Sequence, residues 1–136
     1  MLGFRVCRLR PVLLTWWQML ALSRDCPYTT AILTRAGRFE AAARAFLQGE
    51  VESAEPEQLA AGFLQFLARD ADPLVAAVAA TEAALQEKAA RDRRIRWPQD
   101  PDPVFAYLER GEPFPQDAGA PFMVAVGAEG MVSWPI

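Results

Sequence analysis

Between residues 11 and 92 apolar side chains recur every three or four positions, which is the spacing of one face of an α-helix. Gly37 follows one such stretch, at the position where a left-handed cap favours glycine, and Gly49 is expected to end another. Pro56 and Pro73 stand at the first helical position of two others. The pattern therefore predicts about five helices: Pro11 to about Arg24, a short helix beginning near Pro27, Arg38–Gln48, a helix beginning at Pro56, and Leu74 to about Arg91.

The pattern changes after Arg91, where a basic segment leads into closely spaced prolines, and we expect a hinge there. Asp102-Pro103 is typical of the cap and first residue of a short sixth helix, which Gly111 ends. Residues 122–126 and 131–134 are rich in the β-branched and aromatic residues that favour strands and flank the turn Gly127–Gly130, so they predict a hairpin. An isolated hairpin is marginal in water, so it must pack on the helices or gain a third strand.

The expected fold is α+β, mainly α, with an N-terminal bundle of about five helices, a short helix and a small C-terminal antiparallel β-hairpin or sheet. A chain of 136 residues suits one core. We expect a helical domain at 1–92 and a small α/β element with the hairpin at 93–136, packed on the first domain as one compact unit.

Composition narrows the function classes. The chain is 52% hydrophobic and 23% charged, which is typical of a globular protein. A net charge of −3 makes nucleic acid an unlikely partner, although a local arginine patch stays possible. The absence of histidine excludes Ser-His-Asp and Cys-His catalysis and histidine metal sites. We therefore predict no catalytic residue, metal ligand or cofactor in this chain.

The cysteines and the N-terminus bear on location. Cys7 and Cys26 have no motif spacing, so we favour two buried or half-buried thiols in a reducing cytoplasm over a disulfide.

Arginines followed by the apolar run Val12–Leu22 have the form of a signal peptide within residues 1–23. The bulky tryptophans in the run favour a first amphipathic helix instead. The run is too short to cross a bilayer, so no membrane role is expected.

Four features are candidates for function, and each has a simpler explanation. The arginines at 91, 93, 94 and 96, with Trp97 beside them, could bind phosphate or an acidic peptide. We favour the simpler interpretation that they are the solvent-exposed C-terminal end of a helix, where cations interact well with the helix dipole. Asp100 and Asp102 could take part in acid–base chemistry or bind a cation, but helix capping and turn formation explain why aspartate stands at these positions. Glu82 is expected to be partly buried, with an internal partner more plausible than another subunit. Trp16 and Trp17 are adjacent and cannot both face one core, so one of them is a candidate interface anchor.

Several segments together resemble a known family, the helical partner proteins encoded beside the DUF692 multinuclear-iron enzymes. The chain is similar to the methanobactin and thiaglutamate (pearlin) partner subunits and to the HvfC/BufC group, which is labelled as a DNA-binding domain. The resemblance spans roughly residues 12–91 and rests on these segments: Cys26–Leu33, Arg38–Leu47, Leu59–Leu67, Asp72–Leu74, Glu82 and Leu85.

The resemblance implies a non-catalytic accessory subunit that forms a heterodimer with an iron-dependent oxidase of TIM-barrel fold. The partner would hold the iron and modify a cysteine of a ribosomally made precursor peptide, while this chain helps to recognise the peptide leader. The C-terminal part of such proteins resembles a leader-recognition element, so we expect the strand Phe122–Val126 to offer the docking edge. A helical DNA-binding regulatory domain is the alternative, and a stand-alone enzyme is disfavoured. The residues expected to bind the peptide or the partner are Phe122, Val124, Val126, Trp134, Arg94, Arg96, Trp97 and Trp16.

Overall fold

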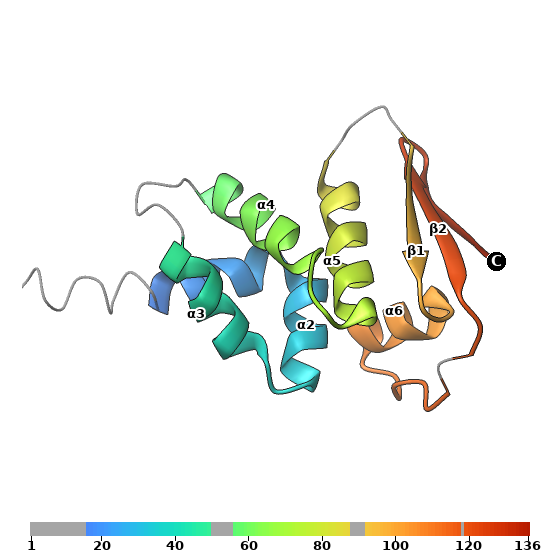
Figure 1. The fold of residues 1–136 in the computed structure, drawn as a ribbon, viewed down its shortest axis with the longest axis horizontal. Helices are drawn as coiled ribbons and strands as arrows, with labels where there is room; N and C mark the ends of the chain where they lie inside the picture. Colours follow the sequence, from blue (N-terminus) through green and yellow to red (C-terminus); the bar gives the residue numbers. More distant parts are fainter. Residues whose placement is uncertain (1–15, 50–55, 88–91, 118) are drawn as a thin grey trace, which may run out of the picture. The chain divides into compact units, whose positions relative to one another are not determined.

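Among the described residues, helices predominate and the strands all lie in the C-terminal part, after residue 92 (Figure 1). The computed structural model describes residues 16–49, 56–87, 92–117 and 119–136. Residues 16–25 are helical. The remaining elements are α2 (Pro27–Arg35), α3 (Phe39–Gly49), α4 (Pro56–Leu67), α5 (Pro73–Gln86), β1 (Arg93–Trp97), α6 (Pro101–Arg110), β2 (Phe122–Gly127) and β3 (Gly130–Pro135). The predicted fold class, mainly α with a small antiparallel sheet, is confirmed.

The chain divides into two compact units, Met1–Phe63 and Leu64–Ile136, with the boundary inside α4. The predicted boundary between residues 92 and 93 therefore differs from the observed one. Helix α5, which we assigned to the helical domain, belongs to the same unit as the sheet and packs against β1 and β2. Periodicity reveals that a helix has an apolar face, but it does not reveal which element covers that face.

In the first unit, the helix at residues 16–25 leads directly into α2. The amide of Cys26 donates to the carbonyl of Leu22 at 2.8 Å, and Pro27 then begins α2. The Cys26 thiol is buried, with its sulfur 3.7 Å from the carbonyl oxygen of Ala60. This confirms a buried thiol at Cys26, whereas Cys7 and the predicted helical start at 11–15 lie outside the described residues.

Aromatic rings from α3 and α4 form the centre of the first unit. The rings of Phe46 and Phe63 lie 5.4 Å apart, and Phe39 meets Phe63 edge-on at 6.3 Å. Gly62 leaves room for this packing, because a Cβ at that position would lie 3.1 Å from Cζ of Phe46. The predicted apolar stripe of the third helix thus meets α4 at a glycine.

In the second unit, α5 begins as its sequence predicts. Asp72 caps the helix by accepting hydrogen bonds from the amides of Leu74, at 2.9 Å, and Val75, at 3.4 Å. The predicted continuation to about Arg91 is wrong, because Glu87 already has an extended backbone, with φ −73° and ψ 105°. Residues 88–91 lie outside the described part of the chain.

The basic segment after α5 forms a strand, so the predicted hinge and helix end are both wrong. Strand β1 pairs antiparallel with β2, and β2 pairs antiparallel with β3, giving the order β1-β2-β3. The prolines that suggested a break all follow Trp97 and leave the strand intact. Helix α6 begins at Pro101, two residues earlier than expected, because Asp100 rather than Asp102 is its cap. Gly111 ends it with φ 68°, as predicted.

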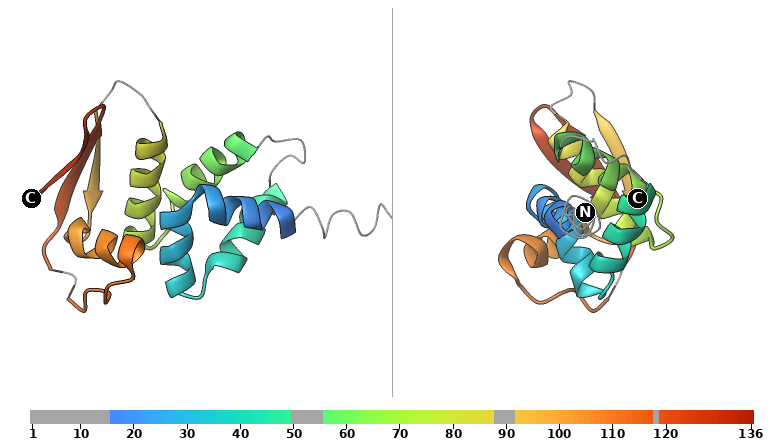
Figure 2. Two further views of the ribbon diagram at one scale, coloured as in Figure 1. Left: turned by 180° about the vertical axis from the view of Figure 1, so that it is seen from behind. Right: turned by 90° about the vertical axis from the view of Figure 1, so that its left-hand side faces the viewer.

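Helices α5 and α6 lie on the same side of the sheet (Figures 1 and 2). Trp97 fills the space between them and is fully buried. Its indole Nε1 donates to Oγ1 of Thr81 in α5 at 2.9 Å, and its ring lies 5.4 Å from that of Phe105 in α6. The core of the second unit is therefore built around one tryptophan of β1.

Across the described ranges, no helix has the length and apolar character needed to cross a bilayer.

Candidate functional site

The sheet has two chemically different faces. Its inner face, toward α5, carries Trp97, Val124 and Val126, all buried. The strand register places Arg94, Ala125 and Val132 in one row across the sheet, and Arg96, Met123 and Trp134 in the next. Since side chains alternate along a strand, these rows lie opposite the buried ones. We call this set the outer sheet face: Arg94, Arg96, Met123, Ala125, Val132 and Trp134.

Four of the predicted binding residues belong to the inner side instead. Trp97 and Val124 are 0% exposed and Val126 is 4% exposed, so none of them is accessible to a partner. Phe122 is half-buried and pairs with Trp97 in the register. The prediction that residues 122–126 offer a docking edge is also wrong, because β2 is the central strand and is paired on both sides. The sequence pattern missed β1, and without β1 the strand β2 would have been an edge.

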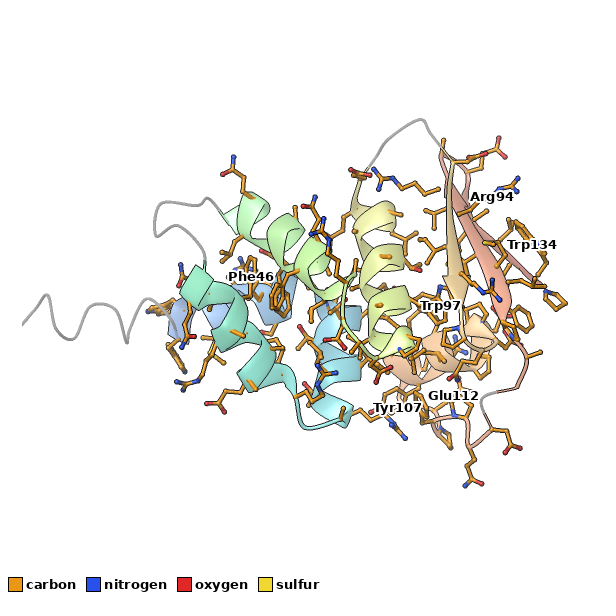
Figure 3. All side chains as sticks on the ribbon, in the orientation of Figure 1. Phe46, Arg94, Trp97, Tyr107, Glu112 and Trp134 are labelled. Carbon is orange, nitrogen blue, oxygen red and sulfur yellow. The ribbon has the colours of Figure 1, made fainter. Side chains whose placement is uncertain are left out.

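The other predicted residues of the second unit do reach the surface. Arg94, Arg96 and Trp134 are exposed, and Val132 beside Trp134 is 62% exposed. The guanidinium carbon of Arg94 lies 5.7 Å from the centroid of the Trp134 ring (Figure 3). This distance is within the range of a cation–π interaction. The outer sheet face therefore combines an exposed aromatic ring with two cations.

The two outer strands of the sheet differ as docking edges. Strand β1 contains no proline, so each of its residues has a backbone N–H as well as a carbonyl. Strand β3 ends in Pro135, which lacks the N–H. Arg93 of β1 forms an ion pair with Glu87 at 2.7 Å, whereas Arg94 and Arg96 form none with any described residue. Strand β1 is thus a cationic edge with complete main-chain donors and acceptors.

A second exposed patch lies in the first unit, on the helix at residues 16–25. Trp16 is 55% exposed, Trp17 is 62% exposed and Leu20 is 42% exposed. The two indole rings meet edge-on with their centroids 5.1 Å apart. We expected one of the two tryptophans to be exposed, and both are. The buried hydrophobic side chains in this part of the chain are those of Leu22 and Cys26.

The carboxylates have mainly structural positions. Asp100 accepts a hydrogen bond from the amide of Asp102 at 3.0 Å, which is the capping explanation of that pair. Glu82 is 2% exposed, so its predicted burial is confirmed. Within the described ranges, no three side chains of histidine, cysteine, aspartate or glutamate are grouped as metal ligands.

Comparison of the chain with protein-family models, with curated proteins and with solved structures gives no match. The candidate surfaces are therefore judged on their geometry and chemistry.

Proposed function

We propose that the chain is a non-catalytic accessory subunit that forms a heterodimer with a DUF692-type iron enzyme. In this proposal it helps to bind the leader of a ribosomally made precursor peptide in the cytoplasm, and the partner enzyme holds the iron and modifies a cysteine of the peptide. The observation that carries the proposal is the three-stranded antiparallel sheet, in which β1 and β3 each have one hydrogen-bonded neighbour among the described residues. An extended peptide can add to such an edge through main-chain hydrogen bonds.

The exposed helix patch supports the heterodimer in this proposal. Large aromatic side chains dominate the binding energy of protein interfaces when a partner removes them from water. Trp16 and Trp17 expose more than half of their surface and lie side by side. We assign this patch to the iron enzyme and the sheet edge to the peptide, so that each partner has its own surface.

The test is co-expression with a DUF692-type enzyme encoded beside this chain. The expected result is a one-to-one complex on size exclusion, with iron in the complex and none in this chain alone. The complex should also bind the synthetic leader of a neighbouring cysteine-containing precursor more tightly than the enzyme alone. Two separate monomers with no mutual affinity would refute the proposal.

The helical DNA-binding alternative has one observation in its favour, the two arginines without ion pairs on the outer sheet face. The net charge of −3 opposes it. A salt-dependent shift of duplex DNA by the purified chain, together with no affinity for the iron enzyme, would favour the alternative.

A further inference from the structure

Strand β1 combines a main-chain edge with two cations whose charge no described carboxylate neutralises. Its sequence is Arg-Arg-Ile-Arg-Trp, with Arg94 and Arg96 on the outer sheet face and exposed. Arg93 differs from them because it is already paired with Glu87 at 2.7 Å. The charge available to a ligand is therefore that of two guanidinium groups spaced two residues apart on one strand.

The strand is held firmly from its inner side. Trp97 is fully buried and donates its hydrogen bond to Thr81, and Ile95 is half-buried on the same face. On the outer side, the ring of Trp134 lies against the guanidinium of Arg94 at 5.7 Å. The contacts on the inner side hold the backbone of β1 in place before any ligand binds, which lowers the entropic cost of binding. Because Trp134 is on β3, across the central strand from β1, the Arg94 guanidinium has to leave this ring to pair with a strand added at the free edge of β1.

The spacing of the two arginines defines what an added strand must carry. Side chains directly opposite each other in neighbouring strands have Cβ atoms about 4.5–5.5 Å apart, and opposite charges at such positions attract. Residues that face Arg94 and Arg96 are themselves two positions apart in the added strand. The residue between them points to the inner face, beside the half-buried Ile95, so an apolar side chain is the one expected there.

We propose that β1 binds an extended peptide segment with an acidic-apolar-acidic alternation, whose two carboxylates pair with Arg94 and Arg96. This inference rests on the proposed function, because it names the class of peptide that the sheet edge takes. Charged edge strands also discourage indiscriminate strand pairing. A neutral strand would leave both cations without a counter-charge, so the same two residues select against it.

Phosphates of a single-stranded nucleic acid would also attract two arginines. Such ligands are usually held by aromatic rings on which bases stack, and the aromatic ring of the outer sheet face, that of Trp134, has Arg94 over it in the free chain. The chain as a whole has a net charge of −3 and a pI near 5.0, which repels a polyanion more than a short peptide. The observations therefore favour the peptide.

The experiment measures binding of labelled synthetic peptides to the full chain by fluorescence anisotropy. The probe is Gly-Thr-Glu-Val-Glu-Val-Thr-Gly, and its controls are the same peptide with lysine for glutamate and one with glutamates and valines reordered as Glu-Glu-Val-Val. A fourth peptide keeps the side chains of the probe but has N-methyl groups that block strand pairing on either edge. Only the alternating acidic probe should bind, and its affinity should fall as salt is raised.

The matched variants are Arg94→Gln and Arg96→Gln, with Arg69→Gln as a control that removes the same charge from an exposed residue outside the sheet. Each of the first two should weaken the affinity for the probe peptide by about threefold, and the double variant should weaken it by about tenfold, as expected for exposed charge pairs. Arg69→Gln should leave the affinity unchanged.

Equal binding of the N-methylated peptide would overturn strand addition, and equal binding of the lysine peptide would overturn the charge preference. Tighter binding of an oligothymidylate, lost in the same two variants, would replace the peptide with nucleic acid. These outcomes are separate from the co-expression test. A heterodimer that binds its leader equally well in the Arg94 and Arg96 variants refutes this inference alone, whereas absence of the heterodimer refutes the proposed function.

Discussion

The indole nitrogen of Trp97 donates a 2.9 Å hydrogen bond to the hydroxyl of Thr81, and both residues are 0% exposed. The bond joins helix α5, which precedes residues 88–91 in the chain, to strand β1, which follows them. Because neither group is accessible to water, each depends on the other to satisfy its polar atom. A residue that ends the basic segment in the sequence is thus the centre of the core of its unit.

Replacing Thr81 by valine keeps the branched shape of the side chain and removes the acceptor. We expect the free energy of unfolding to fall by about 1–3 kcal/mol, because the Trp97 N–H is left buried without a partner. Urea unfolding followed by circular dichroism measures the difference. Thr34→Val, at an exposed position of α2, is the control and should change stability by less than about 0.5 kcal/mol. Equal effects of the two changes would show that the hydrogen bond does not stabilise the core.

Gly62 of α4 provides a second test of packing, in the first unit. Alanine is favoured over glycine in a helix by about 1 kcal/mol, but a Cβ here would lie 3.1 Å from Cζ of the buried Phe46. Phe46 also packs against Phe63 at 5.4 Å, so it has little room to move. We therefore expect Gly62→Ala to destabilise the protein in spite of its helix propensity.

The sign of this effect should reverse when the ring is removed. In a Phe46→Leu background, Gly62→Ala should stabilise the protein, because only the propensity remains. Urea unfolding of the four proteins of this cycle measures the coupling between the two positions. If Gly62→Ala stabilised the protein in the original background, the Phe46 ring would be able to shift at little energetic cost.

The helices were predictable because their signals are local. Asp72 followed by a proline, and glycines at 37 and 111, determine where helices begin and end through hydrogen bonds and backbone angles within a few residues. The hairpin was predictable for the same reason. Its two strands are rich in residues that favour strands and are joined by a short turn ending at Gly130, whose φ of 122° suits glycine.

Strand β1 was not predictable in the same way, and the candidate site changed with it. Its three arginines hide the alternation, because Arg93 lies on the same side of the strand as the apolar Ile95 and Trp97, and the strand is only five residues long. Its partner β2 is distant in sequence, and pairing at that distance leaves no local signature. Predicting β2 as an edge followed directly from missing β1. Arg94, Arg96 and Trp134 were identified as candidates, but only the register shows that they share one face.

The contact between Arg94 and Trp134 can be measured directly. The two residues come from strands on opposite sides of β2, so their interaction crosses the central strand. A double-mutant cycle with Arg94→Gln and Trp134→Leu should give a coupling of about 0.5–1 kcal/mol in the free energy of unfolding, as expected for an exposed cation–π pair. Arg69→Gln combined with Trp134→Leu should give none. A coupling of zero for the first pair would mean that the Trp134 ring does not stabilise the Arg94 side chain in the free protein.

The exposed tryptophans of the first unit yield the last prediction, which separates the two proposed surfaces. Trp16→Ala and Trp17→Ala should each weaken binding of the iron enzyme, and at least one of them by about 30-fold, since a central aromatic anchor contributes about 2 kcal/mol or more to an interface. Both side chains are more than half exposed, so neither change should lower the stability of the free chain much. Isothermal titration calorimetry with the enzyme, and circular dichroism of the free variants, check the two statements.

The control for this prediction is Val132→Ala, which truncates a side chain that is 62% exposed on the outer sheet face. It should leave the affinity for the enzyme unchanged, while the two tryptophan variants should leave the affinity for the acidic probe peptide unchanged. If Val132→Ala weakens the enzyme complex and the tryptophan variants do not, the enzyme binds the sheet. In that case the sheet edge cannot be reserved for the peptide, because the two partners would compete for one surface.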